Sequence, residues 1–372
     1  MCRGLAQLIL VCGLCWCSVE LKMTDSNPKM KPNCPSHAPI DAVVTWVDGE
    51  DPAHKAKLNA YLGKLDAVPE IASADRYRET GEFAYCIASL LRFAPWLRRI
   101  YIVTDDQEPA FMEVIRRSSW REKVVVVDHK VLFAGFEQHL PTFNNRSLLT
   151  ALWRIPGLAD RILYLNDDFA CLHPVSPADF FSGDKVVLRG RWCMQPWHHQ
   201  VGRLLRAVAD ACRVVRKVPA ARPGYHQAQA LAAQLAGYRF RYFRSPHVPH
   251  PLLRPLLVDH FGRHPEQFEI NLRYRLRSPE QFLADALGNH LALGSGRAVV
   301  DNRLSTLRLN QSHYRAARLG PLLEKAERDA GVAFICMQSL ESLDAERREV
   351  MLGWLERRIG RPEEIFAGAG AG

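Results

Sequence analysis

Three polar residues, Asn166, Asp167 and Asp168, directly follow a short apolar run in the middle of the chain. The run, Ile162 to Leu165, contains a β-branched and an aromatic residue and predicts a buried β-strand. Two adjacent carboxylates repel each other unless a cation lies beside them, and Mg²⁺ or Mn²⁺ prefers carboxylate and amide oxygens as ligands. An ordinary polar turn is the alternative, because Asn and Asp are common turn residues.

Three predicted strands earlier in the chain also end in an acidic residue. They are residues 40–47 before Asp48, residues 99–104 before Asp105, and residues 123–127 before Asp128. In an open α/β sheet, ligands bind in the crevice outside the carboxyl ends of the strands. The row of acidic strand ends therefore predicts one cleft along one edge of a sheet.

The second half of the chain contains basic groups that could face these acids. His247 lies in the proline-rich segment 245–251, and such a rigid loop can present an imidazole as a general base. Arg273, Arg275 and Arg277 alternate along the chain, and guanidinium forks match phosphate oxygens bidentately. The alternatives are a histidine satisfied by the local backbone and a solvated run of charge.

The elements that position these residues are predicted from the alternation of strands and helices. Helices are expected at residues 52–65, 82–93, 111–117 and 145–154, between the strands. This alternation predicts an α/β fold, Rossmann-like, with a mostly parallel sheet. The second half is expected to be mainly helical, with helices at 198–218, 227–235, 251–261, 279–293 and 341–359 and a short strand at 240–243.

Four regions follow from this pattern. We expect a leader or linker at residues 1–38, an α/β half at 40–190, a mainly helical half at 191–366 that completes the cleft, and a flexible tail at 367–372. The apolar segment 5–19 resembles the core of a signal peptide and is short for a transmembrane helix. A misassigned start is the alternative, because Met23 or Met30 could begin the folded part.

The chain has 372 residues, 10 cysteines and a formal net charge of +9. Five cysteines fall in residues 1–34, and the other five are widely spaced without a CxxC pair, which favours free thiols in a reducing compartment. The basic residues are scattered among acids, which argues against nucleic acid as a partner. We therefore expect a cytoplasmic protein, with peripheral association with the inner membrane left open.

Longer segments carry a more specific signal. They are IDAVVTWVDG at 40–49, RYR at 76–78, APWLRRIYIVTD at 94–105, VDH at 127–129, LPTFN at 140–144, IPGL at 155–158, YLNDD at 164–168, PHVPHP at 246–251 and a weaker FICMQ at 334–338. Together they resemble the Stealth family of sugar-1-phosphate transferases. That family includes bacterial capsule and exopolysaccharide phosphotransferases and the animal N-acetylglucosamine-1-phosphotransferase.

The resemblance implies a GT-A-like version of the Rossmann fold and a role for each matching residue. The implied roles are metal ligation by Asp167 and Asp168, catalysis by Asp168, His247 and Arg277, and substrate binding by Asp48, Arg76, Asp105 and Asn166. This chain departs from the family pattern at Ala84, Ala88 and Leu149, and at Gln338-Ser339 where the family has Asn-Asp. These departures bear on which substrate is used.

The function implied is that of a phosphotransferase that depends on Mg²⁺ or Mn²⁺. It would transfer a hexose-1-phosphate from a UDP-sugar donor to a hydroxyl of a polysaccharide or oligosaccharide acceptor and release UMP, in capsule or exopolysaccharide synthesis. One alternative is a metal-dependent glycosyltransferase that transfers the sugar and releases UDP. A second alternative is a polysaccharide-binding protein without catalytic activity.

Overall fold

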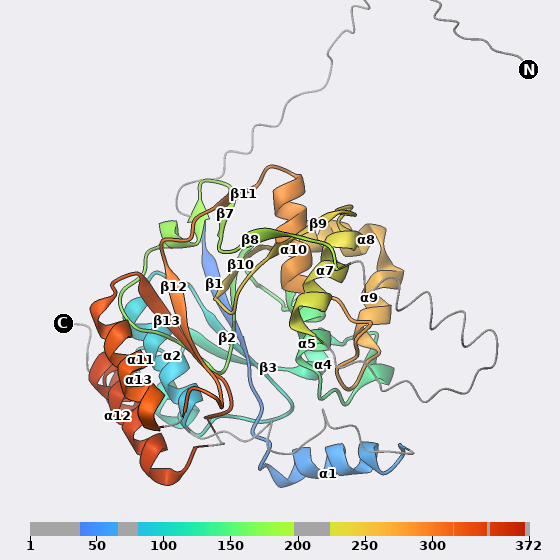
Figure 1. Cartoon of the computed structure of the whole chain (residues 1–372). Helices are drawn as coiled ribbons and strands as arrows, with labels where there is room; N and C mark the ends of the chain where they lie inside the picture. The colour runs from blue at the N-terminus through green and yellow to red at the C-terminus, as the bar shows by residue number, and fades with distance from the viewer. Residues whose placement is uncertain (1–37, 66–80, 197–223, 315, 341–342, 369–372) are drawn as a thin grey trace, which may run out of the picture. The chain divides into compact units, whose positions relative to one another are not determined.

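A five-stranded sheet with strand order β10-β4-β1-β2-β3 lies at the centre of the structure (Figure 1). Its strands are β1 (Ile40–Thr45), β2 (Ile100–Thr104), β3 (Val124–Asp128), β4 (Arg161–Asn166) and β10 (His250–Leu253). Strands β1 to β4 are parallel, whereas β10 pairs with β4 in the antiparallel direction. The prediction of an α/β fold with a mostly parallel sheet is therefore confirmed.

The structure is a computed structural model that describes residues 38–65, 81–196, 224–314, 316–340 and 343–368. The expected leader up to residue 37, the predicted helix 198–218, Arg76 and the last four residues of the tail lie outside the described residues. From Pro35 onward the chain forms one structural unit. No helix in these described ranges is both long and apolar enough to cross a membrane.

Side chains of the central sheet alternate between its two faces and pack into two separate hydrophobic cores. Val44, Ile102 and Leu165 belong to the core on one face, and Val43 and Tyr164 belong to the core on the other. Both faces are apolar because helices cover both, as expected for parallel strands. The carboxyl ends of the strands are left as the open edge.

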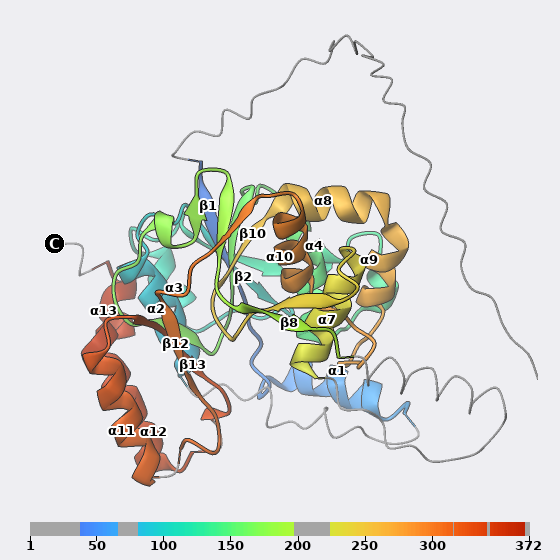
Figure 2. The ribbon, with the colours of Figure 1, turned by 45° about the horizontal axis from the view of Figure 1, so that its top comes forward.

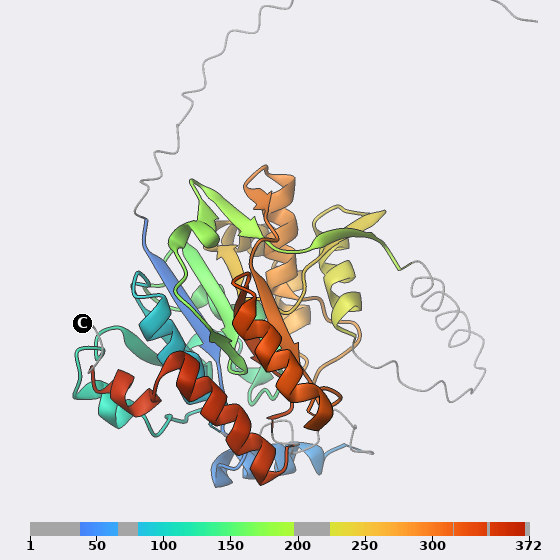
Figure 3. The same ribbon diagram turned by 60° about the vertical axis from the view of Figure 1, so that its left-hand side comes forward.

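Helices form a layer on each face of the sheet (Figure 2). One layer contains α2 (Glu82–Phe93), α12 (Ala345–Ile359) and α13 (Pro362–Phe366), which pack together as Figure 3 shows. The other layer contains α5 (Asn145–Ala151), α7 (Tyr225–Leu235), α8 (Arg254–Arg263), α9 (Pro265–Leu272) and α10 (Ala284–Gly294). The remaining helices are α1 (Pro52–Leu62), α3 (Met112–Arg116), α4 (His129–Leu132) and α11 (Ala316–Arg328).

Three small sheets surround the central one and extend it toward the second half of the chain. The first has the order β11-β7-β6, with β6 (Phe181–Ser182), β7 (Lys185–Leu188) and β11 (Ala298–Val300). The second has the order β12-β13-β5, with β5 (Phe169–Cys171), β12 (Ser305–Leu309) and β13 (Val332–Met337). The third joins β8 (Arg191–Met194) and β9 (Arg241–Arg244).

Two sequence expectations need correction here. The predicted helix 251–261 is in fact strand β10 followed by α8, because residues 250–253 pair with Arg161–Tyr164 of β4 before the helix begins at Arg254. The second half is helical as expected, but it also supplies β11, β12 and β13, whose pairing partners lie far away in the sequence. Local propensity gives little signal for such strands.

Candidate functional site

A cavity of about 760 Å³ lies at the carboxyl ends of β1, β3 and β4. Its lining brings together Asn166, Asp167, Asp168, His247 and Arg277, which the sequence analysis had selected as site residues. The first three lie at the carboxyl end of β4, and the other two come from loops of the second half. The lining therefore combines acidic groups from the end of β4 with basic groups from the second half of the chain.

Asp167 and Asp168 form the turn between β4 and β5, where the chain passes from the central sheet to the sheet β12-β13-β5. The Met337 N–H donates to the Asp168 carbonyl at 2.8 Å, and the Cys336 thiol donates to Asp168 Oδ2 at 3.4 Å. Asp168 Oδ1 is buried and has no hydrogen-bond partner among the described residues. Burial, together with the nearby charge of Glu82, raises the pKa of Asp168 to about 6.

The two carboxylates fit a divalent cation. Asp168 carries a buried oxygen without a donor, and Glu82 adds negative charge to the same cavity lining. Within the described ranges, no group of three or more His, Cys, Asp or Glu residues is arranged as a complete metal site. Mg²⁺ does not require such a group, because it binds through one or two carboxylates and takes its other ligands from water and substrate phosphates.

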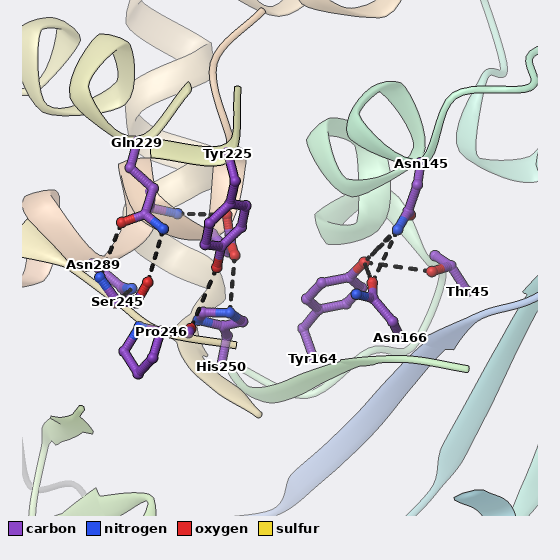
Figure 4. A network of polar contacts seen from close by, with 12 residues as sticks. Thr45, Asn145, Tyr164, Asn166, Tyr225, Gln229, Ser245, Pro246, His250 and Asn289 are labelled. Atoms are coloured by element: carbon purple, nitrogen blue, oxygen red, sulfur yellow. Dashed lines mark hydrogen bonds and ion pairs between the residues drawn. The ribbon is translucent and has the colours of Figure 1, made fainter. Parts of the chain in front are cut away.

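Asn166 is held in place at the end of β4 (Figure 4). The Tyr164 hydroxyl and the Asn145 amide donate to Asn166 Oδ1, at 2.6 and 2.9 Å. Burial raises the pKa of Tyr164, so its phenol stays protonated and can donate. Two donors occupy Asn166 Oδ1, which leaves the amide N–H groups as the part of this side chain that can contact a ligand.

His247 lies in the loop between β9 and β10, and its ring stacks on Tyr225 with centroids 4.3 Å apart. The loop is anchored by Gln229, which donates to the Ser245 carbonyl and accepts from the Ser245 N–H, both at 2.9 Å (Figure 4). Burial, reinforced by the nearby positive charge of Arg308, lowers the pKa of His247 to about 3. The imidazole is therefore neutral at neutral pH and can accept a proton.

Arg277 reaches the cavity from the loop between α9 and α10. Asn144 holds this loop, because its amide donates to the carbonyls of Tyr274 and Leu276 at 2.8 and 3.0 Å. The positive charge of Arg277 favours the carboxylate of Asp168 and opposes protonation of His247, so the guanidinium acts on both.

The other two arginines of the alternating run point elsewhere. Arg273 donates to the Tyr274 hydroxyl, and Arg275 donates to the Gln138 carbonyl. Neither lines the cavity. Of the three guanidinium groups, the cavity therefore receives only that of Arg277.

Asp48 and Asp105 lie beside the cavity but do not line it. Asp48 caps its own turn by accepting from the Glu50 N–H at 2.8 Å. Asp105 is buried and lies 3.0 Å from His54 Nδ1 and 3.1 Å from Lys57 Nζ. Burial alone would raise the Asp105 pKa, but the bonds with His54 and Lys57 outweigh it and lower the pKa to about 2. Asp105 thus orients His54, which does line the cavity.

Two segments of the chain match the conserved regions of one protein family. Residues 38–66 match conserved region 1 of the Stealth proteins, and residues 76–188 match conserved region 2. The chain belongs to the Stealth family. The resemblance stated from the sequence is therefore confirmed. Asp167, Asp168 and Asn144 lie inside Stealth region 2, whereas His247 and Arg277 lie beyond both matched regions.

Several relatives are named polysaccharide phosphotransferases. An exopolysaccharide phosphotransferase of Streptomyces coelicolor is 35% identical over 78% of this chain and 46% of its own length. The capsular polysaccharide phosphotransferase WcwK of Streptococcus pneumoniae is 40% identical over 39% of this chain and 42% of its own length. The exopolysaccharide phosphotransferase CpsY of Mycobacterium tuberculosis is 28% identical over 87% of this chain and 57% of its own length. The chain thus spans about half the length of these curated relatives.

Two solved glycosyltransferases were also similar to the chain. Mouse xyloside xylosyltransferase 1 matches over 80% of this chain and 97% of its own, at 15% identity and a TM-score of 0.36. The galactosyltransferase LgtC matches over 87% of this chain and 98% of its own, at 14% identity and a TM-score of 0.40.

The Stealth regions also supply polar groups that the sequence analysis did not select. Trp46 Nε1, Thr142 Oγ1 and both ring nitrogens of His129 are buried, line the cavity and have no hydrogen-bond partner among the described residues. Burial lowers the pKa of His129 to about 4, so this imidazole is neutral as well. Trp46 lies two positions before Asp48 and His129 follows Asp128, so both lie beside the acidic ends of predicted strands, and this position could have identified them.

Proposed function

We propose that the protein is a metal-dependent phosphotransferase. It transfers a hexose-1-phosphate from a UDP-sugar to a hydroxyl of a polysaccharide or oligosaccharide acceptor and releases UMP. The observation that carries this proposal is one cavity whose lining includes Asp167, Asp168, Arg277 and a neutral His247. The names of the matched relatives support the same class of reaction.

In this proposal Asp167 and Asp168 hold the divalent ion. A bound Mg²⁺ or Mn²⁺ would neutralise charge on the donor diphosphate and on the leaving UMP. The unpartnered Oδ1 of Asp168 supports this assignment, since a buried carboxylate oxygen without a donor is costly unless a cation satisfies it. Asn166 is fixed beside the pair and directs its amide N–H groups to the substrate.

The basic residues of the cavity accept the proton and bind the transferred phosphoryl group. The acceptor oxygen forms a bond to the phosphorus that carries the sugar, the bond from that phosphorus to UMP breaks, and the hydroxyl proton passes to His247. His247 starts neutral, and arrival of the phosphates would raise its pKa and make it a better base. Arg277 binds phosphoryl oxygens with its fork and balances their charge.

The nucleoside end of the donor is proposed to lie at the ends of β1 and β3. Trp46 offers an indole N–H, Thr142 a hydroxyl, and His129 one donor and one acceptor, all buried and without hydrogen-bond partners in the described part of the chain. A polar ligand would satisfy these groups, whereas an apolar ligand would leave them unpaired. We also infer that the protein acts in the cytoplasm, where UDP-sugars are made.

The released nucleotide tests the proposal. The full chain is incubated with a panel of UDP-sugars, capsule oligosaccharides and Mg²⁺ or Mn²⁺, and nucleotides are separated by ion-exchange chromatography. UMP formed only in the presence of acceptor and metal supports the proposal. UDP would indicate the glycosyltransferase alternative, and binding of oligosaccharide without any nucleotide release would indicate a binding protein.

A further inference from the structure

Arg308 lines the same cavity, from β12 at the edge of the sheet β12-β13-β5. In that sheet Arg308 pairs in register with Cys336 of β13, which pairs with Phe169 of β5. Paired residues of neighbouring strands project from the same face of a sheet. Arg308 therefore lies on the face that presents Cys336, whose thiol is 3.4 Å from Asp168 Oδ2.

The guanidinium of Arg308 is held in a fixed orientation but is not neutralised. Its Nε and Nη2 groups both donate to Gln338 Oε1, at 3.0 and 2.8 Å. Gln338 is a neutral amide, and within the described ranges no carboxylate pairs with Arg308. Arg303, five positions earlier, shows the opposite case, because it pairs with Asp301 through Nη2 at 2.7 Å.

Arg308 and His247 line the same cavity, and the charge of Arg308 acts on the His247 imidazole. After burial, Arg308 is the strongest influence that lowers the His247 pKa, ahead of His250 of β10, His226 of α7 and Arg277. Two guanidinium groups therefore act on one neutral imidazole in the cavity. Such an arrangement repels cations and favours a multiply charged anion.

We propose that Arg308 is a second phosphate-binding residue of this cavity, oriented by Gln338 and acting beside Arg277. Gln338 occupies two of the five N–H groups of the guanidinium, so the outer edge of the fork can bind a phosphate bidentately. The ligand class is a diphosphate ester, with one arginine for each phosphate. This assignment builds on the proposed function, but anion binding can be measured without any turnover.

Binding of inorganic pyrophosphate and of UDP to the full chain, measured by calorimetry with Mg²⁺ present, tests the proposal. Arg308→Gln should weaken both by roughly tenfold or more, because a charge-assisted contact is lost. Arg303→Gln removes a comparable exposed guanidinium outside the cavity lining and should bind like the wild type. Gln338→Glu should also weaken binding, since a carboxylate would neutralise Arg308 without removing it.

Arg308→Lys separates charge from geometry. It keeps the charge and loses the fork, so its affinity should fall between those of the wild type and Arg308→Gln. Affinity equal to the wild type would overturn the bidentate contact. This variant and Gln338→Glu keep the test decisive if Arg308→Gln does not fold.

A second readout is the pKa of His247, followed by NMR of the imidazole C–H groups. It should rise in Arg308→Gln and stay close to the wild-type value in Arg303→Gln, which a purely structural role for Arg308 would not produce. Unchanged pyrophosphate affinity together with an unchanged His247 pKa in Arg308→Gln would overturn the proposal. Release of UDP by the wild type would reject the phosphotransferase function and leave the binding result for Arg308 intact.

Discussion

The two sides of the cavity are built in different ways. The acidic wall, Asp167 and Asp168 with Glu82 nearby, lies at the end of a central strand that is buried on both faces. The basic wall, His247, Arg277 and Arg308, comes from two loops and an edge strand. The regular sheet fixes the acidic wall, and pairing with β13 fixes the position of Arg308. Hydrogen bonds between side chains and backbone fix the loops that carry His247 and Arg277.

Substitutions on the two walls should therefore act in different ways. A change in the acidic wall should remove charge and leave the fold intact, because the strand behind it is held by its neighbours on both sides. The basic wall can be weakened indirectly, through Asn144, which bonds the Arg277 loop, or Gln229, which bonds the His247 loop. The predictions below follow that distinction, from the largest expected effect to the smallest.

Asp168→Asn should lower activity by roughly 10³-fold, because a charged metal ligand is replaced by a neutral one. The melting temperature should stay within about 3 °C of the wild type, since the substitution keeps the side-chain shape. Turnover with saturating Mg²⁺ and thermal unfolding measure the two effects. Asp106→Asn, at an exposed strand end paired with Lys130, is the matched control. Full turnover of the wild type in excess chelator would refute the metal assignment.

His247→Gln should lower kcat by roughly 100-fold with little change in donor KM, as expected for loss of a general base. The pH profile should differ from that of an ordinary histidine. Because burial and Arg308 lower the His247 pKa to about 3, the free enzyme should show no loss of kcat/KM near pH 6.5 that depends on His247. Near wild-type turnover by His247→Gln would make the loop structural and move the base to Asp167 or Asp168.

Asn144→Ala should lower activity by about tenfold although Asn144 carries no charge, because the Arg277 loop would lose its anchor. The free energy of unfolding should fall by about 1–3 kcal/mol, since the Leu276 carbonyl would lose its donor and the Tyr274 carbonyl would keep only that of the Ser147 hydroxyl. Denaturant titration and turnover measure both. Asn302→Ala removes a similar bond, to the Gly190 carbonyl, away from the cavity, and an equal loss of activity there would contradict the anchoring role.

The smallest expected effect is on stability in mild acid. His129 has a pKa of about 4 in the folded protein because it is buried, against about 6.5 when unfolded. The contribution of neutral His129 to the free energy of unfolding is fully present above the pKa of the unfolded state. It is lost as the pH falls from about 6.5 toward 4. His129→Asn should reduce the loss of stability between about pH 7 and 5 by about 2 kcal/mol. His264→Asn is the control. An unchanged pH dependence of stability in His129→Asn would indicate that His129 contacts solvent.

The sequence predicted the acidic wall much better than the basic wall. The strands predicted at 40–47 and 162–165 are found as Ile40–Thr45 and Arg161–Asn166, and the helix predicted at 82–93 has the same bounds in the structure, because local apolar patterns determine these elements. The placement of His247 and Arg277 in the same cavity depends on loops that only the folded chain brings together. Nothing in the local sequence marks Arg308, because its position depends on the pairing of β12 with β13.

Asp105 is a residue that the sequence analysis selected but that does not line the cavity. The resemblance to the Stealth family implied a substrate contact for Asp105, and in the structure its carboxylate bonds to His54 and Lys57. The sequence does not show whether an acid at a strand end contacts the substrate or orients another residue. For Asp105 this depends on where α1 places His54 and Lys57. The cavity lining therefore contains His54 in place of Asp105.

The fate of the phosphorus attached to the donor sugar tests the central claim most directly. A UDP-sugar labelled with ³²P in the β-phosphate, the one that carries the sugar, is incubated with the full chain, Mg²⁺ and an oligosaccharide acceptor. We predict that the label moves to the acceptor as a phosphodiester, that unlabelled UMP is released, and that Asp168→Asn stops both. Label that remains in released UDP, with unlabelled sugar on the acceptor, would contradict the account.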